Sequence, residues 1–169
     1  MFDETIVEVK PQTKPNREKT INVEVDVDTK GRKYRMYCFV ERHLSPIDKG
    51  IQAAHSIVEY SKEYGNYPSY YRWANYDKTI ILLNGGNIND LDDICKELNE
   101  WKIKYTLFKE EDLGGIVTSV AVLVDDRVFD EEYYHYEIEE REESGFDLTE
   151  EEYQICVLRE LIKSKHLAR

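Results

Sequence analysis

Gln52 and His55 are the first residues in this chain whose types and spacing could support chemistry. Residues three apart on a helix share a face, so one ligand could meet both side chains. An imidazole titrates near neutral pH and can serve as a general base or acid. The alternative, which spacing alone favours for a lone histidine, is a helical residue hydrogen-bonded into a neighbouring sheet.

A second candidate is an acid followed closely by two glycines, Asp112-Leu113-Gly114-Gly115. Glycines let the backbone approach a ligand, so this turn could form the rim of a cleft. An acid in such a turn can equally serve only to shape it, by hydrogen-bonding to its own backbone. The residues alone leave both interpretations open.

The sequence lacks the motifs of common cofactor and metal sites. Gly85-Gly86 has neither the spaced third glycine of a dinucleotide fold nor the Gly-Lys-Ser/Thr of a P-loop. Cys38, Cys95 and Cys156 are too widely spaced for a disulfide framework or a paired metal motif. We therefore expect no cofactor and no metal, and we interpret the cysteines as small buried residues in a reducing cytoplasm.

Membrane insertion and secretion are also not expected. No apolar run approaches the roughly 18–20 residues that a membrane helix needs. Residues 1–4 lack the basic and apolar regions of a signal peptide. The expected location is the cytoplasm.

The elements that must position the candidate residues follow from hydrophobic patterning. Residues 20–28 alternate apolar and polar, which predicts an edge strand, and residues 30–32 predict a turn. Residues 35–41 form an apolar run typical of a strand buried on both faces. Ser45 and Pro46 predict a helix start, because serine caps helices and proline fits the first position. We expect the buried stripe of this helix to be Ile47, Ile51, Ala54 and Val58.

The remaining core elements alternate between strands and helices. Residues 79–83 predict a second buried strand, and Asn89 predicts the cap of a second helix. Residues 105–108 and 116–124 predict two further strands, joined by a turn too short for a crossover. This order predicts an α/β fold with three layers, α/β/α, around a mixed four-stranded sheet. The apolar side of the second helix comprises Leu91, Ile94, Cys95, Leu98 and Trp101.

One segment carries the whole charge imbalance of the chain. The net charge is −12 at pH 7, and residues 125–152 contain fourteen acids and two bases. The other residues hold 21 bases and 21 acids, so the overall acidity says little about any one cleft. Thr149 predicts the cap of a last helix. We therefore expect an N-terminal extension with an edge strand (1–33), a core (34–128) and an acidic helical C-terminal extension (129–169). This extension should be separable unless the apolar stripe over residues 153–161 packs on the sheet.

Tyrosine is frequent, with 13 residues, and several lie between the first helix and the second core strand. Aromatic rings at the mouth of a site can stack bases, at ~1–3 kcal/mol each. We favour the alternative, in which they pack a short segment over the core. These aromatic residues are Tyr60, Tyr64, Tyr67, Tyr70, Tyr71, Trp73 and Tyr76.

From about residue 34 to residue 124 the chain resembles peptidyl-tRNA hydrolases of the second type, typical of archaea and eukaryotes, in a divergent form like the bacterial and viral relatives. The matching features are Arg42-His43-Leu44, Gln52-Ala53-Ala54-His55, Trp73, Asp112-Leu113-Gly114 and Thr118, in that order. The resemblance implies a mixed four-stranded sheet between helices, which agrees with the order predicted above.

The resemblance also implies hydrolysis of the ester between a peptide and the terminal ribose of tRNA, without a cofactor. Family members usually carry a Lys-Gly-Lys before the first helix. This chain is two residues shorter there and reads Ile47-Asp48-Lys49-Gly50, with an acid near the expected lysine. The implied catalytic residues are Gln52, His55, Asp112 and Thr118, and the implied substrate-binding residues are Lys49, Gly114 and Gly115. The implied partners are peptidyl-tRNA or tRNA, and a second copy of the chain in a homodimer.

A second hypothesis is a non-catalytic protein of the same fold. The altered lysine motif and the acidic segment favour it, because residues 125–152 could engage a basic partner or an RNA-binding protein. The presence of Gln52, His55, Asp112 and Thr118 favours the enzyme.

Overall fold

The computed structural model describes residues 29–168, and the strand expected over residues 20–28 lies outside them. The strands are β1 (Tyr34–Glu41), β2 (Thr79–Gly86), β3 (Tyr105–Glu110) and β4 (Ile116–Asp125). The longer helices are α2 (Pro46–Tyr64), α4 (Ile88–Glu100) and α7 (Glu150–Lys163). Shorter helical segments are α3 (Pro68–Arg72), η1 (Trp73–Asp77), η2 (Glu111–Leu113), η3 (Asp126–Val128), α5 (Glu131–Tyr133), η4 (Tyr134–Glu139) and α6 (Glu140–Glu143).

The strands form one mixed sheet in the order β2-β1-β4-β3. β1 and β2 are parallel, and β4 is antiparallel to both β1 and β3. β1, β2 and β3 therefore run in one direction, although β4 separates β1 from β3. Their carboxyl ends, at Glu41, Gly86 and Glu110, meet at one side of the sheet, which we call the carboxyl edge.

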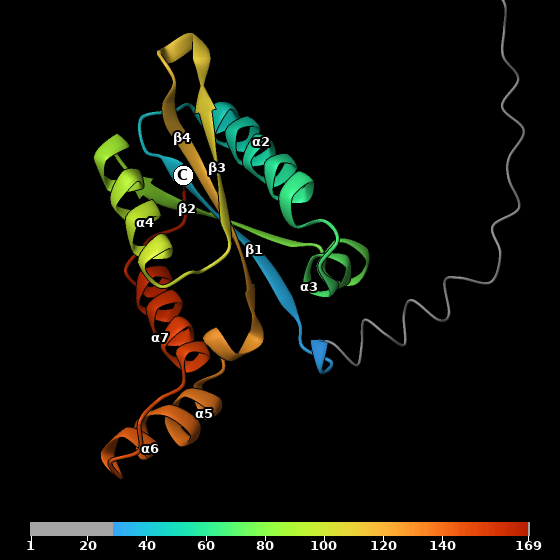
Figure 1. The fold of residues 1–169 in the computed structure, drawn as a ribbon. Coiled ribbons are helices and arrows are strands. Elements are labelled where there is room, and N and C mark those ends of the chain that lie inside the picture. The colour runs from blue at the N-terminus through green and yellow to red at the C-terminus, as the bar shows by residue number, and fades with distance from the viewer. Residues whose placement is uncertain (1–28, 169) are drawn as a thin grey trace, which may run out of the picture.

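Two hydrophobic cores lie on opposite faces of the sheet (Figure 1). α2 and α3 cover one face, and α4 and α7 cover the other. Successive residues of β4 serve the two cores in turn, because side chains alternate along a strand. Val120 and Val122 pack on the side of α4, whereas Ala121 packs on the side of α2. The three-layer α/β fold predicted from the sequence is confirmed.

The tyrosines in the last turns of α2 and just after it mainly pack against one another. The buried ring of Tyr60 lies 4.8 Å from the Tyr64 ring and 6.1 Å from the Tyr70 ring, measured between centroids. The Trp73 indole is buried, and its Nε1 donates to the Thr79 carbonyl at 2.9 Å. For these residues the packing interpretation is confirmed.

α7 packs on the sheet as part of the core, which is the alternative in which the C-terminal extension is not separable. Its Ile155, Leu158 and Leu161 are buried on the face that α4 covers. Beyond α7, the chain end pairs with β2 through an antiparallel bridge between Leu83 and Leu167. By contrast, residues 131–143, which we call the acidic arm, project past the end of the sheet (Figure 1).

The face of α2 that meets the sheet is not the expected one. Ile47, Ile51 and Val58 are 76%, 46% and 55% exposed, and Ala54 is exposed as well. The buried residues of α2 are Lys49, Gln52, Ala53, Ser56 and Tyr60. The spacing of apolar residues predicts the wrong buried face for α2. The reason is that the part of the sheet below α2 presents hydroxyl groups, which bind polar groups of the helix.

Local capping signals correctly locate two helix starts. Ser45 caps α2, and Thr149 caps α7 in a capping box. α4 begins two residues earlier than expected, because its cap is Asn87. The Asn89 N–H donates to the Asn87 side chain at 2.8 Å, so Asn89 is already inside the helix.

Candidate functional site

The side chain of Gln52 is buried and joins α2 to β3 and β4. Its Nε2 donates to Oε2 of Glu110 at 2.7 Å, and its Oε1 accepts from the Thr118 hydroxyl at 3.1 Å. An ionised carboxylate can only accept hydrogen bonds, which fixes the orientation of the amide. The predicted residues Gln52 and Thr118 thus lie together at the carboxyl edge, and Glu110 joins them.

A β-bulge explains how Thr118 reaches α2. Phe108 of β3 pairs with Ser119 of β4, but the next residue, Lys109, pairs with Val117. Thr118 is therefore the extra residue of the bulge. A bulge breaks the strict alternation of side chains and re-aims one of them. As a result the adjacent hydroxyls of Thr118 and Ser119 both meet α2.

Buried hydroxyl groups fix the position of α2 over the sheet. Oγ of Ser119 donates to the Gln52 carbonyl at 2.6 Å, and Oγ1 of Thr106 donates to the Ser56 carbonyl at 2.8 Å. All four residues are buried. A buried polar group left without a partner costs about 1–3 kcal/mol, so these bonds select one position of the helix. That position places the Gln52 amide between β3 and β4.

His55 lies beside this cluster at the surface. Its ring is exposed and stacks on the Phe108 ring, with 4.4 Å between centroids and 14° between planes. Among residues 29–168 the structure describes no hydrogen bond to the His55 ring. The interpretation of His55 as a histidine hydrogen-bonded into the sheet is therefore wrong. Its ring nitrogens are available to solvent or a ligand.

The turn after β3 holds Asp112 at the surface. Gly114 and Gly115 follow with φ of 82° and 75°, the left-handed region that favours glycine. Their N–H groups donate to the carbonyls of Glu111 and Glu110, at 3.0 Å and 2.9 Å. These bonds occupy both N–H groups within the turn. In this structure neither N–H group is left to donate to a substrate, so substrate binding by Gly114 and Gly115 stays a prediction from the resemblance.

The structure does not join Asp112 to His55. Within the described part of the chain, no hydrogen bond or ion pair links the two side chains. Both are exposed and belong to the same edge, since His55 stacks on Phe108 of β3 and Asp112 lies just past the end of that strand. Gln52 and Thr118 are the buried residues of this edge, and we call the exposed His55 and Asp112 its rim residues.

A carboxylate–histidine pair at the end of β1 was not found by sequence reasoning. Glu41 is 7% exposed, and its carboxylate accepts from the backbone N–H groups of His43 and Leu44. Oε1 of Glu41 lies 2.7 Å from Nδ1 of His43, and Nε of Arg42 donates to Nε2 of His43 at 3.2 Å. A guanidinium only donates, so Nδ1 carries the proton. The one signal in the sequence for this pair is that Glu41 ends an apolar run and precedes His43 by two residues.

Lys49, which the resemblance implies as a substrate-binding residue, is buried in the first turn of α2. It precedes Gln52 by three residues and so shares its face of the helix. The acid beside it, Asp48, has a different role, because its carboxylate accepts from the capping Ser45 hydroxyl at 2.6 Å. Asp48 therefore belongs to the helix cap.

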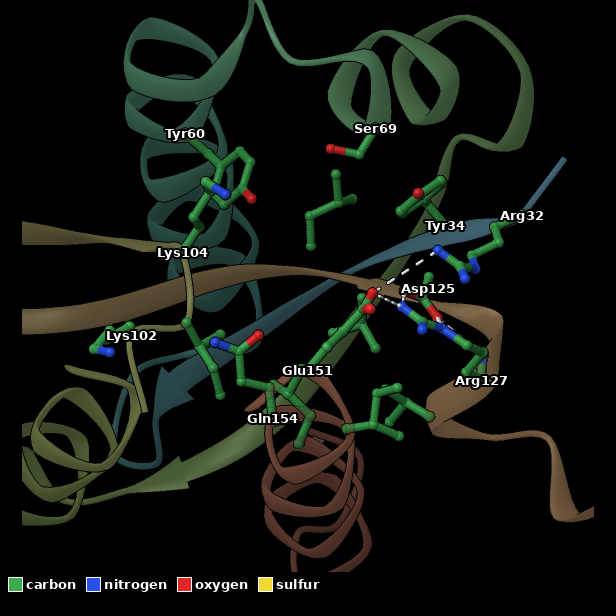
Figure 2. A pocket seen from close by; sticks show the side chains of 16 residues that line it. Arg32, Tyr34, Tyr60, Ser69, Lys102, Lys104, Asp125, Arg127, Glu151 and Gln154 are labelled. Atoms are coloured by element: carbon green, nitrogen blue, oxygen red, sulfur yellow. Dashed lines mark hydrogen bonds and ion pairs between the residues drawn. The ribbon is translucent and has the colours of Figure 1, made fainter. Parts of the chain in front are cut away.

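A hollow of about 320 Å³ lies at the opposite edge of the sheet, where β1 begins and β4 ends (Figure 2). Its charged groups bind one another. Arg127 donates to Asp125 at 2.8 Å and to Glu151 at 2.7 Å, and Glu151 also lies 4.0 Å from Arg32. Glu151 reaches from α7 toward both arginines (Figure 2).

The pKa values in this hollow follow from the same contacts. Burial disfavours the charged guanidinium of Arg127, but its hydrogen bonds to Asp125 and Glu151 outweigh burial and raise its pKa. The bond from Arg127 lowers the pKa of Glu151. We interpret this hollow as an ion-pair network that attaches α7 to β4, and not as the site of chemistry.

No protein-family model matches this chain, and no curated protein matches it. Among residues 29–168, no cluster of three histidine, cysteine or acidic side chains has the arrangement of a metal site. The helices of the same residues include none with the length and apolar character required to cross a membrane.

Proposed function

We propose that this chain is a hydrolase that cleaves the ester between a peptide and the terminal ribose of tRNA, or a related aminoacyl ester. The observation that carries the proposal is the Gln52 amide, held between Glu110 and Thr118 at the carboxyl edge. Open α/β sheets bind their ligands at this edge. The order of motifs between residues 34 and 124 supplies the substrate class, as a resemblance.

The proposed reaction is attack of a water molecule on the ester carbonyl. His55 and Asp112, at the rim, orient the water and accept its proton. Gln52 has two N–H donors and gives one to Glu110, so the other can polarise the carbonyl oxygen as charge develops on it. The bond to the ribose oxygen then breaks, and the abstracted proton moves to that oxygen. Lys49 neutralises phosphate or oxyanion charge.

The proposal names peptidyl-tRNA as the partner and the cytoplasm as the location. The three cysteines are free thiols, which is compatible with a reducing compartment. The homodimer stays a prediction from the resemblance alone.

A release assay tests the proposal. Peptide released from a labelled peptidyl-tRNA is measured for the wild type, for His55→Gln and for Asp112→Asn. Removing the group that acts as the general base should slow release by about 10²–10⁴-fold. Asp93→Asn is the matched control, because Asp93 is an exposed acid of α4 that pairs with Lys96. No release by the wild type would refute the hydrolase, and full activity of both rim variants would refute their roles.

The acidic arm favours a second candidate function, which is binding of a basic protein. The arm projects past the sheet (Figure 1). The side chain of Tyr136 within it is 59% exposed. Its acids lie in the segment that holds fourteen acids and two bases. A lysine-rich peptide should then bind the wild type and lose affinity as salt rises. Replacement of Glu137, Glu139 and Glu140 by Gln should weaken that binding, while Gln52→Ala should leave it unchanged.

A further inference from the structure

The two edges of the sheet differ in what lies beside them. The chain end lies along β2, because the Asn84 N–H donates to the His166 carbonyl at 2.8 Å and the Ala168 N–H donates to the Leu82 carbonyl at 3.0 Å. β3 forms the other edge, and within residues 29–168 no strand pairs with the side of β3 that faces away from β4. An edge strand presents a row of unpaired N–H and C=O groups on its outer side. The main chain of β3 can therefore bind a further strand.

A groove of about 400 Å³ lies beside the first half of β3. Two helices on opposite faces of the sheet line it, and β3 is the only strand that does so. A hollow with this lining lies outside the edge strand, between the helices. A single extended chain fits such a groove, whereas a second copy would bring its own flanking helices against α2 and α4. The lining residues are Glu59, Glu63 and Tyr64 of α2, Asn99 of α4, and Tyr105, Thr106 and Leu107 of β3.

A row of α2 side chains follows this edge toward the candidate site. His55, Glu59 and Glu63 are each four residues apart, so they form one stripe of the helix. Glu59 and Glu63 line the groove, and His55 stacks on Phe108 in the second half of β3. The strand then ends at Glu110, which accepts a hydrogen bond from the amide of the candidate site. The edge of β3 thus leads from the groove to that site.

The charges along the edge favour one orientation of a bound peptide. Glu59 and Glu63 are the charged residues of the groove lining, and Lys62 pairs with Glu59 at 2.8 Å. Within residues 29–168 no ion pair includes Glu63, so its charge can attract a cation. At the other end, three consecutive acids begin at Glu110 and would repel a free carboxylate. A peptide with a cationic amino-terminal end at Glu63 and a neutral carboxyl-terminal end at Glu110 complements both ends.

We propose that the outer edge of β3 binds an extended peptide by β-strand addition, parallel to β3, with its cationic amino-terminal end beside Glu63. Main-chain hydrogen bonds supply the affinity in this mode, so one edge can accept many sequences. The six residues of β3 match a peptide segment of similar length, because a strand rises by about 3.3 Å per residue.

The identity of the peptide rests on the proposed function. In peptidyl-tRNA the carboxyl terminus of the peptide is the ester that is cleaved, so it carries no charge. A peptide that lies parallel to β3 brings this terminus to the carboxyl edge, where the Gln52 amide lies. The proposal therefore assigns the edge of β3 to the peptide part of the substrate.

Binding of a peptide that cannot be hydrolysed tests the site without any ester cleavage. The hexapeptide amide Lys-Thr-Val-Thr-Val-Ala-NH₂ is titrated into the full chain, and calorimetry measures its affinity. Glu63→Lys should weaken binding by about fivefold, the effect of one exposed ion pair. Glu97→Lys is the matched control, because Glu97 lies on α4 in a hollow shared with α7. No saturable binding, or equal weakening by both substitutions, would overturn the site.

Hydrogen exchange shows whether the peptide adds to the sheet. NMR should show slower exchange of the outward-facing amides of β3 when the hexapeptide binds, because they gain partners. The amides of β1 should be unaffected, since β1 is paired on both sides. Unchanged exchange in β3 would overturn strand addition. Replacement of Glu137, Glu139 and Glu140 by Gln should leave hexapeptide binding unchanged, and a loss would assign the peptide to the acidic arm instead.

N-methylated probes test the role of the peptide main chain. Only alternate N–H groups of a strand face one neighbour, so methylation of one alternate set should abolish binding. Methylation of the other set should leave binding nearly intact. Equal effects of the two sets would contradict recognition through the main chain.

The carboxyl end of the probe tests the orientation. The free-acid form of the hexapeptide should bind about fivefold more weakly than the amide, because its carboxylate meets the acids that begin at Glu110. Equal affinity of the acid and the amide would overturn the parallel orientation.

Kinetics separate this inference from the proposed function. With a peptidyl-tRNA that begins with lysine, Glu63→Lys should raise KM by about fivefold and leave kcat unchanged, because Glu63 is remote from the reacting ester. Weaker hexapeptide binding with an unchanged KM would overturn the link to the substrate. Ester cleavage without hexapeptide binding would overturn the peptide site and leave the hydrolase. Hexapeptide binding without ester cleavage would retain the site and refute the hydrolase.

Discussion

The Gln52 side chain must accept a hydrogen bond from Thr118 and donate one to Glu110. A carboxamide has both an acceptor and donors, whereas a carboxylate only accepts and a leucine does neither. This requirement explains a polar residue on the sheet-facing side of α2. It also makes Thr118 and Glu110 responsible for the orientation of the amide.

Thr118→Val tests this hydrogen bond, because it removes the hydroxyl while nearly conserving the side-chain shape. The substitution leaves Oε1 of Gln52 without its Thr118 donor, so the free energy of unfolding should fall by about 1–2 kcal/mol. Urea unfolding measures the change. Thr79→Val at an exposed position of β2 is the control and should stay within about 0.5 kcal/mol. Equal effects of the two substitutions would contradict a buried Thr118–Gln52 bond.

The residues of the candidate site differ in how far the sequence predicts them. Gln52 and Thr118 follow from the resemblance, and the structure places them in contact. The sequence does not predict Glu110 as a site residue, because Glu110 is one of three consecutive acids. Only the position where β3 ends decides which of the three faces α2. Glu41 was missed for a similar reason, since spacing does not show that the last residue of a strand is buried.

At the scale of elements, α2 presents apolar residues to solvent and polar residues to the sheet. The hydroxyls of Thr106 and Ser119 donate to its backbone carbonyls, and the bulge adds the Thr118 hydroxyl, which donates to the Gln52 side chain. Hydropathy patterning assumes that the partner surface is apolar. The sequence therefore predicts the start of α2 correctly and its buried face incorrectly.

A pair of glutamine substitutions checks the orientation of α2. Val58→Gln changes an exposed side chain and should alter the free energy of unfolding by no more than about 0.5 kcal/mol. Ala53→Gln forces a larger polar group between α2 and the sheet and should cost about 1–3 kcal/mol or more. Chemical unfolding measures both. A larger loss of unfolding free energy for Val58→Gln than for Ala53→Gln would show that Val58, and not Ala53, lies on the buried face of α2.

The start of α7 should make stability depend on pH. The backbone N–H of Thr149 donates to Glu152, and its hydroxyl and Arg141 add to the effect, so the pKa of Glu152 is lowered from 4.5. A carboxylate with a lowered pKa stabilises the fold above its unfolded pKa, and the contribution disappears as pH falls through the folded pKa. Glu152→Gln should thus cost about 1 kcal/mol at pH 7. Urea unfolding should show a smaller difference near pH 3, and a constant difference would argue against a titrating cap.

At the scale of the whole molecule, the C-terminal region serves two purposes. α7 closes the second hydrophobic core, and the chain end beyond it pairs with the edge of β2. The acidic arm separates α7 from β4 in sequence. Its charge conceals the fact that α7 belongs to the core, which is why the sequence alone suggested a detachable extension.

Leu158→Ala measures the contribution of α7 to the core. Leu158 is 7% exposed, so its truncation should cost about 2–5 kcal/mol. Leu167→Ala is the matched control, because Leu167 is 67% exposed, and it should cost far less. Cooperative urea unfolding gives both values. A negligible effect of Leu158→Ala would mean that the sheet folds without α7.

The sheet itself was predictable because helices between apolar strands require parallel crossovers. The antiparallel β3–β4 pair followed from the short turn between them. Strand order was not predictable in the same way. It depends on which edge of β1 each crossover reaches, and this is decided by the packing of α2 and α4 on opposite faces.

Single-turnover cleavage of peptidyl-tRNA by the wild type and by Gln52→Ala tests the central claim most directly. The predicted result is ester cleavage by the wild type and a loss of about 10²–10³-fold in Gln52→Ala, because one donor to the developing oxyanion is removed. Gln154→Ala is the control at the opposite edge of the sheet, where Gln154 bonds the Trp101 carbonyl, and it should cleave like the wild type. No cleavage by the wild type, or equal rates for the wild type and Gln52→Ala, would contradict a hydrolytic site at the carboxyl edge.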